Sequence, residues 1–239
     1  MPQLRKVFRI LRHDPTSGEP PRRQTYVVDC KPHWTVLMAL LEIASRKDAS
    51  LAFRRSCRHG ICGSCAVTIN GENRLSCETR LAALGEGLVE VEPLRAMPVI
   101  KDLVVDMTGL FERYELVRPY LVAKGPPPER ERLQSPQQRR LLDGSYECIM
   151  CGSCTSSCPS YWARRDFLGP QALLAASRWV LDSRDEATSE RLAALDSPQG
   201  LWRCHDIFNC VEACPKGLNP TRAIAMLRRK ALKRKILGK

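Results

Sequence analysis

The chain has 239 residues, enough for one or two domains with modest cores. Its net charge of +12 is accompanied by no recognisable nucleic-acid-binding motif, so we expect no nucleic-acid partner. It contains no apolar run of roughly 18 residues and begins with a charged segment, so we expect neither a transmembrane helix nor a signal peptide.

The first 106 residues have the pattern of a small mixed sheet with one helix. Residues 36–47 have helical spacing, with leucines on one face. A turn-rich stretch, DPTSGEPP, separates the first two strands, and Asn70-Gly71 is a hairpin turn signal between two later ones. The expected strands are residues 7–11, 25–28, 66–69, 74–77 and 88–93.

The pattern becomes helical after residue 106. Gly125-Pro126-Pro127-Pro128 interrupts the chain between the first two helices of this part. We therefore expect an α+β protein with two domains, residues 1–106 and residues 107–239. The expected helices are residues 107–121, 136–142, 170–182, 188–195 and 221–237.

Eleven of the twelve cysteines fall into three spaced groups, which is the strongest functional signal in the chain. The first group has the plant-type spacing C-x4-C-x2-C-x11-C, which is typical of a 2Fe–2S cluster. Gly60 and Gly63 fit a ligand loop whose backbone must pass close to sulfur. The predicted ligands are Cys57, Cys62, Cys65 and Cys77.

The second and third groups are related to each other. The second, C-x2-C-x2-C-x3-C-P, is the bacterial run in which the fourth cysteine reaches the other cluster. The third has the same spacing except that Ile207, which offers iron no lone pair, stands where a cysteine is expected. Crossing of the fourth cysteines then predicts Cys148, Cys151, Cys154 and Cys214 around a 4Fe–4S cluster, and Cys158, Cys204 and Cys210 around a 3Fe–4S cluster.

Zinc and disulfides are the competing interpretations of these thiols. Structural zinc usually takes four ligands in separated pairs, whereas cysteines spaced by two residues suit a cubane. Disulfides require an oxidising compartment, for which the sequence gives no secretory signal. Cys30 is left over, and we expect it to be a small buried side chain rather than a ligand.

The order of these motifs resembles the iron–sulfur subunit of succinate dehydrogenase and fumarate reductase. The resemblance covers essentially the whole chain and is closer to the succinate dehydrogenase side. It implies a plant-type, β-grasp-like 2Fe–2S ferredoxin domain followed by an all-α two-cluster ferredoxin domain. The strings that carry it are FRRSCRHGICGSCAVTING, PVIKDLVVDM, SPQQRRLLDGSYECIMCGSCTSSCPSYW and RCHDIFNCVEACPKGLNPTRAI.

This resemblance implies an electron-transfer role with no catalytic residue on the chain itself. A separate flavoprotein, which alone carries FAD, would oxidise succinate. Electrons would pass through the three clusters to a quinone held with hydrophobic membrane-anchor subunits, with or without haem b. The subunit would lie on the cytoplasmic face of a bacterial or archaeal membrane. The alternatives are a fumarate reductase subunit working in the opposite direction and, from another class, a structural zinc-binding interaction protein.

The resemblance also implies a quinone site at the three-iron end of the chain. For Trp162 the alternative role is helix packing; for His205 it is a hydrogen bond to backbone or sulfur, and for Ser160 a bond to the local backbone. The basic residues after position 220 contact either anionic lipid or only water. The implied quinone-site residues are Pro159, Ser160, Trp162, His205 and Ile207.

Overall fold

The computed structural model describes residues 4–237, which form two compact units. The sheet unit contains the residues up to Met107 together with Ile149–Ser157. The helical unit contains Thr108–Cys148 and the chain from Cys158 onward. Residues 149–157 therefore pack with the first part of the chain, although the sequence pattern placed them in the second. Lys239 of the basic tail lies outside the described residues.

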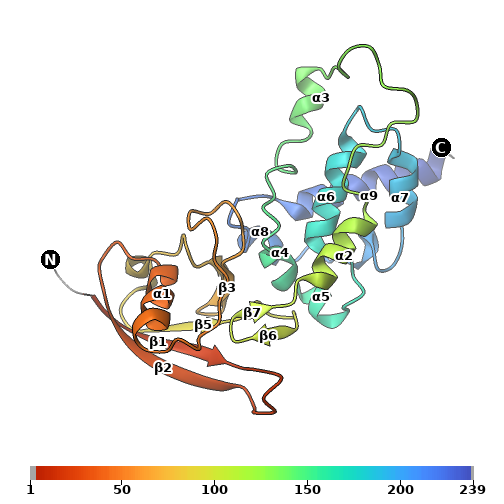
Figure 1. Cartoon of the computed structure of the whole chain (residues 1–239). Coiled ribbons are helices and arrows are strands. Elements are labelled where there is room, and N and C mark those ends of the chain that lie inside the picture. The colour runs from red at the N-terminus through yellow and green to blue at the C-terminus, as the bar shows by residue number, and fades with distance from the viewer. Residues whose placement is uncertain (1–3, 238–239) are drawn as a thin grey trace. The chain divides into compact units, whose positions relative to one another are not determined.

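The sheet unit is built on a five-stranded mixed sheet of order β2-β1-β5-β3-β4 (Figure 1). β1 pairs antiparallel with β2 and parallel with β5, while β3 pairs antiparallel with both β4 and β5. The mixed sheet and the helical region that follows it agree with the predicted fold class. The strands are β1 (Leu4–Arg12), β2 (Arg22–Cys30), β3 (Ala66–Ile69), β4 (Glu72–Leu75) and β5 (Leu88–Glu92).

Helix α1 (Val36–Arg46) packs against this sheet (Figure 1). The helix begins where the Thr35 side chain accepts a hydrogen bond from the Met38 amide, and its apolar face joins Phe8 and Ile10 of β1 in the core. Cys30 lies in the same core with 1% of its surface exposed. Burial raises the pKa of this thiol to about 11, so Cys30 is the small buried side chain that was expected.

Two short elements differ from the sequence prediction. Asn70 and Gly71 both have positive φ, as a two-residue hairpin turn requires, so β4 begins directly at Glu72 and ends two residues earlier than predicted. Cys77 consequently lies in the turn after β4. A second hairpin, β6 (Val99–Lys101) and β7 (Val104–Val105), was not predicted because strands of three and two residues carry too little alternation to detect.

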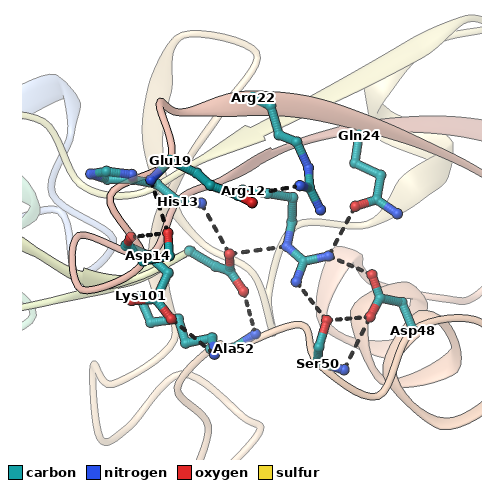
Figure 2. Close-up of polar contacts among 12 residues, drawn as sticks. Arg12, His13, Asp14, Glu19, Arg22, Gln24, Asp48, Ser50, Ala52 and Lys101 are labelled. Atoms are coloured by element: carbon teal, nitrogen blue, oxygen red, sulfur yellow. Dashed lines mark hydrogen bonds and ion pairs between the residues drawn. The ribbon is translucent and has the colours of Figure 1, made fainter.

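The end of β1 is fixed by a buried polar network around Arg12 (Figure 2). The Arg12 guanidinium donates to Asp102 at 3.0 Å, to the Tyr26 hydroxyl at 2.7 Å, to Gln24 and Ser50, and to Asp48. Asp102 also accepts from the backbone amides of His13 and Ala52. Because Asp102 lies in the β6–β7 turn, this network joins that hairpin to β1, β2 and the segment after α1.

The helical unit is organised around α6 (Gly169–Leu181), which contacts α2 (Thr108–Leu116), α7 (Thr188–Leu195) and α9 (Pro220–Leu237). α2 ends five residues earlier than predicted, because Pro119 follows and the buried Arg191 side chain binds the carbonyls of residues 117, 118 and 120. No helix within residues 4–237 combines the length and apolarity needed to cross a bilayer. The shorter helices of this unit are α3 (Pro136–Arg140), α5 (Pro159–Ala163) and α8 (Asn209–Glu212).

Candidate cluster sites

The first ligand loop turns its backbone amides toward Cys57. The Cys57 sulfur accepts hydrogen bonds from the amides of His59 at 3.5 Å and of Ile61 and Cys62 at 3.3 Å. These bonds, with that of His59 the largest contribution, lower the pKa of Cys57 to about 6. The loop is therefore preorganised to hold a thiolate, which is the form of cysteine that binds iron.

The remaining thiols of the first group have different surroundings. Cys65 and Cys77 are buried, and burial raises the pKa of Cys77 to about 12, with Cys65 as a further cause. Cys62 is exposed and lies 3.1 Å from the Ser64 hydroxyl. Gly60 has a φ of +74°, and a Cβ there would collide with the Glu78 carboxylate. The loop thus needs glycine for its conformation.

The four predicted ligands of the second cluster are divided between the two units. Cys151 and Cys154 belong to the sheet unit, where α4 (Ser153–Ser156) carries Cys154. Cys148 and Cys214 belong to the helical unit and pack against the apolar residues Leu174, Leu218 and Ala223. The assignment of these four thiols to one cluster stays a prediction from the sequence spacing.

We call the second cysteine group the intact run and the third group, which has Ile207 in place of a cysteine, the gapped run. The two runs adopt the same local backbone conformation. Gly152 has φ 78° and ψ −7°, and Phe208, at the corresponding place in the gapped run, has φ 71° and ψ −7°. Two residues before each, Met150 and Asp206 also have positive φ, at 52° and 54°. A four-residue helix follows in both cases, so Ile207 holds in one turn the place that Cys151 holds in the other.

The three thiols predicted for the third cluster line one pocket in the helical unit. The space between its lining residues is about 310 Å³, part of which is open solvent. Burial raises the pKa of Cys204 to about 11 and also raises that of Cys210, whose sulfur lies 3.3 Å from the Thr221 hydroxyl. The lining consists of Cys158, Pro159, Ser160, Phe167, Pro170, Cys204, His205, Asp206, Ile207, Phe208, Asn209, Cys210 and Thr221.

Four of the five predicted quinone-site residues belong to this lining. Pro159 and Ser160 begin α5, while His205 and Ile207 are exposed in the loop between Cys204 and Cys210. Trp162, also among the described residues, lies outside the lining, on α5, with 39% of its surface exposed. The structure therefore brings the three thiols together with four of the five residues and leaves Trp162 beside them.

Arg228 of α9 anchors the loop that carries Cys204. Its guanidinium donates to Asp206 at 2.8 Å, to the Leu201 carbonyl at 3.0 Å and to the Cys204 carbonyl. Sequence reasoning treated Arg228 only as part of a basic tail and did not single out Phe208 or Thr221. Counting charges cannot show which basic side chain binds the loop. Phe208, in contrast, could have been noticed from the sequence, because it corresponds to Gly152 when the two runs are aligned.

The surroundings of the thiols fit iron–sulfur clusters. In the sheet unit, the buried Thr155 hydroxyl, next to Cys154, has no hydrogen-bond partner among the described residues, so it is a donor available to sulfur. In the helical unit, Cys158, Cys204 and Cys210 line one pocket.

Two family models match the chain. A 2Fe–2S iron–sulfur cluster binding domain matches residues 7–112, and a 4Fe–4S dicluster domain matches residues 144–218. The succinate dehydrogenase iron–sulfur subunit of Paracoccus denitrificans is 52% identical over 225 residues, which cover 92% of this chain and 86% of that protein.

Two solved structures share the fold. A chain of the Mycobacterium smegmatis Sdh1 complex in the apo form matches with a TM-score of 0.86 at 24% identity and covers 98% of each chain. A hypothetical protein from Helicobacter pylori matches with a TM-score of 0.59 at 15% identity, covering 95% of this chain and 40% of that one. At these identities the two matches bear on the fold alone.

Proposed function

The chain belongs to the family of succinate dehydrogenase iron–sulfur subunits, and on this premise we propose that it relays electrons from a succinate-oxidising flavoprotein to a membrane quinone. When bound, its clusters supply one-electron chemistry, which links two reactions that each involve two electrons. Family membership favours cluster ligation over structural zinc, and the name of the relative favours succinate oxidation over fumarate reduction as the physiological direction.

The observation that carries the proposal is the pocket in the helical unit. Three thiols line it together with Ile207, which stands at the backbone place of a ligand cysteine. A site with three sulfur ligands suits a 3Fe–4S cluster, and we propose Cys158, Cys204 and Cys210 as its ligands. For the other two clusters we propose Cys57, Cys62, Cys65 and Cys77, and Cys148, Cys151, Cys154 and Cys214.

Residues around the same pocket support a quinone site, which would lie beside the cluster rather than in the space that the cluster fills. Pro159 and Ile207 offer apolar surface, whereas the Ser160 hydroxyl and the His205 ring can donate hydrogen bonds to a carbonyl oxygen. We propose that these four residues bind the quinone head group and that Trp162 borders the site. Hydrogen bonds from Ser160 and His205 would orient the quinone ring where it receives electrons.

The proposed partners are the flavoprotein, which holds FAD, and hydrophobic membrane-anchor subunits, with or without haem b. With these partners the chain would lie at the cytoplasmic face of a bacterial or archaeal membrane. No residue of this chain is proposed to touch succinate.

The test uses the complex purified with its partner subunits and two electron acceptors. Wild-type complex should reduce both a water-soluble dye and a quinone with succinate. His205→Ala and Ser160→Ala should lower quinone reduction and leave dye reduction at the flavoprotein intact. Ser189→Ala, in the exposed first turn of α7, is the control and should change neither rate. Equal loss of both activities in the pocket variants would refute the quinone assignment.

A further inference from the structure

Gly63, between the ligands Cys62 and Cys65, seats the first ligand loop directly on Cys151. Its φ is +71°, and a Cβ built on it would lie 2.8 Å from the Cys151 Cβ and 2.8 Å from the Ile149 carbonyl oxygen. Carbon atoms in contact are normally about 3.5–4.0 Å apart. All these residues belong to the sheet unit. Only a residue without a side chain allows this approach.

The segment that carries Cys151 is also bound by Asn73 of β4. The Asn73 amide donates to the Ser153 carbonyl at 3.1 Å and to the Ser157 hydroxyl at 2.8 Å. Its oxygen accepts a 2.8 Å hydrogen bond from Thr68, which fixes the orientation of the amide. The Ser156 hydroxyl adds a bond to the Arg95 carbonyl at 2.8 Å.

These contacts are buried, so the attachment is rigid. Asn73 is 7% exposed, and Thr68 and Ser153 are 1% and 0% exposed. Buried, fully paired amide and hydroxyl groups keep their geometry, because leaving one unpaired costs about 1–3 kcal/mol. The sheet edge therefore holds residues 153–157, while Gly63 of the ligand loop lies directly against Ile149 and Cys151.

We propose that Gly63 and Asn73 are positioning residues that set the separation between the 2Fe–2S site and the Cys151 side of the 4Fe–4S site. The inference rests on the proposed relay function. The step it serves moves one electron out of the first centre and into the second, with no bond or proton changed. The rate of such a step depends on the distance between the centres, and here that distance is fixed by a backbone contact with no intervening side chain.

The test measures the distance between the centres in the complex purified with its partners. Both clusters are reduced with dithionite, and electron paramagnetic resonance records how far one paramagnetic centre speeds the spin relaxation of the other. This effect weakens steeply with distance. In Gly63→Ala the added methyl must push Cys151 away, so we expect a loss of relaxation enhancement and slower reduction of the second cluster by succinate.

Gly18→Ala separates this effect from backbone strain. Gly18 has nearly the same φ, +72°, but lies outside the ligand loop, and a Cβ built on it meets no described atom within 4 Å. This variant should retain the wild-type relaxation enhancement. Equal enhancement in Gly63→Ala and wild-type complex of equal iron content would overturn the inference.

Asn73→Asp provides an independent variant if Gly63→Ala does not assemble. It retains the acceptor for Thr68 and removes both donors to residues 153 and 157. We expect it too to lose relaxation enhancement, and an unchanged signal would contradict the proposal. Dithionite reduces the clusters without succinate, so this measurement does not depend on the proposed function. That function would be refuted separately, if the wild-type complex transferred no electrons from succinate.

Discussion

Ile207 and Cys151 occupy the same place in two copies of one backbone turn. In each copy the residue lies between two residues with positive φ and two positions before a short helix. The gapped run has thus kept the loop geometry of a complete run and changed one side chain. On the proposed ligand assignment, the number of ligands would be controlled at this position by side-chain chemistry rather than by a different fold of the loop.

Replacing Ile207 with cysteine should convert the third cluster. A thiol there has the backbone placement of a cubane ligand, so the site should bind a fourth iron. The added thiolate makes the cluster surroundings more negative and should lower its reduction potential, where about 59 mV is a tenfold change for one electron. Electron paramagnetic resonance of the oxidised complex should lose its three-iron signal.

Ile207→Val is the control for this change, because it keeps an apolar side chain without a ligand atom. It should retain the three-iron signal at full intensity. If the Ile207→Cys complex retained that signal as well, the missing thiol would not determine the cluster type.

Phe208→Gly and Phe208→Ala should differ in stability, and the glycine variant should be the more stable of the two. Both remove the ring, but only glycine relieves the left-handed conformation, which costs other residues about 1–2 kcal/mol. We therefore expect the glycine variant to be more stable than the alanine variant by about 1 kcal/mol. Urea unfolding of the two complexes measures this difference. Greater stability of the alanine variant would show that the turn relaxes when the ring is absent.

The Arg12 network should stabilise the sheet unit without pH dependence near neutrality. Hydrogen bonds from the Ser50 and Tyr26 hydroxyls hold the pKa of Asp48 well below its usual range. A group with a lowered folded pKa stabilises above its unfolded pKa, about 3.9, and loses that effect only as pH falls through the folded pKa. Asp48→Asn should therefore destabilise by about 2 kcal/mol at pH 7.

The pH series checks the sign of this effect. The difference in unfolding free energy between wild type and Asp48→Asn should be constant from about pH 5.5 to 8, because Asp48 is ionised in both folded and unfolded chains over that range. The difference should shrink as the pH falls from about 5 to 3, because the unfolded chain is then protonated at Asp48 before the folded one. A difference that stays constant or grows over that lower range would mean that the folded-state pKa is not lowered.

Iron analysis should give about nine atoms per chain, the sum of two, four and three. Cys30→Ser should leave this number and the visible spectrum unchanged, since Cys30 is buried in the core of the sheet unit. Loss of a cluster in that variant would show that the ligand set is wrong, and about four irons would contradict three clusters.

The sequence predicted the longer elements well, because each buries one face with a regular period. α7 was predicted with its observed limits, and β1, β2, α1, α6 and α9 within a few residues. The β6–β7 hairpin was missed, because it depends on Asp102 accepting bonds from residues far away in the chain. Such a contact leaves no local periodicity.

The sequence predicted which thiols belong to each site, but it did not predict the residues that surround those thiols. Spacing alone assigned Cys158, Cys204 and Cys210 to one cluster, and they line one pocket. Nothing in the spacing indicated that Arg228 would bind the carbonyls of that loop, or that Gly63 would touch Cys151. Both contacts join residues distant in sequence, which a single sequence without covariation does not reveal.

The passage of Ile149–Ser157 into the sheet unit also has a consequence for folding during synthesis. When residue 107 leaves the ribosome, the sheet unit still lacks the segment that Asn73 binds, and more than forty residues of the helical unit are made first. Contacts between residues so far apart form slowly, because the loop that joins them must close at an entropic cost. An excised fragment ending at residue 107 would therefore lack both acceptors of the Asn73 amide, Ser153 and Ser157, and would not contain the complete sheet unit.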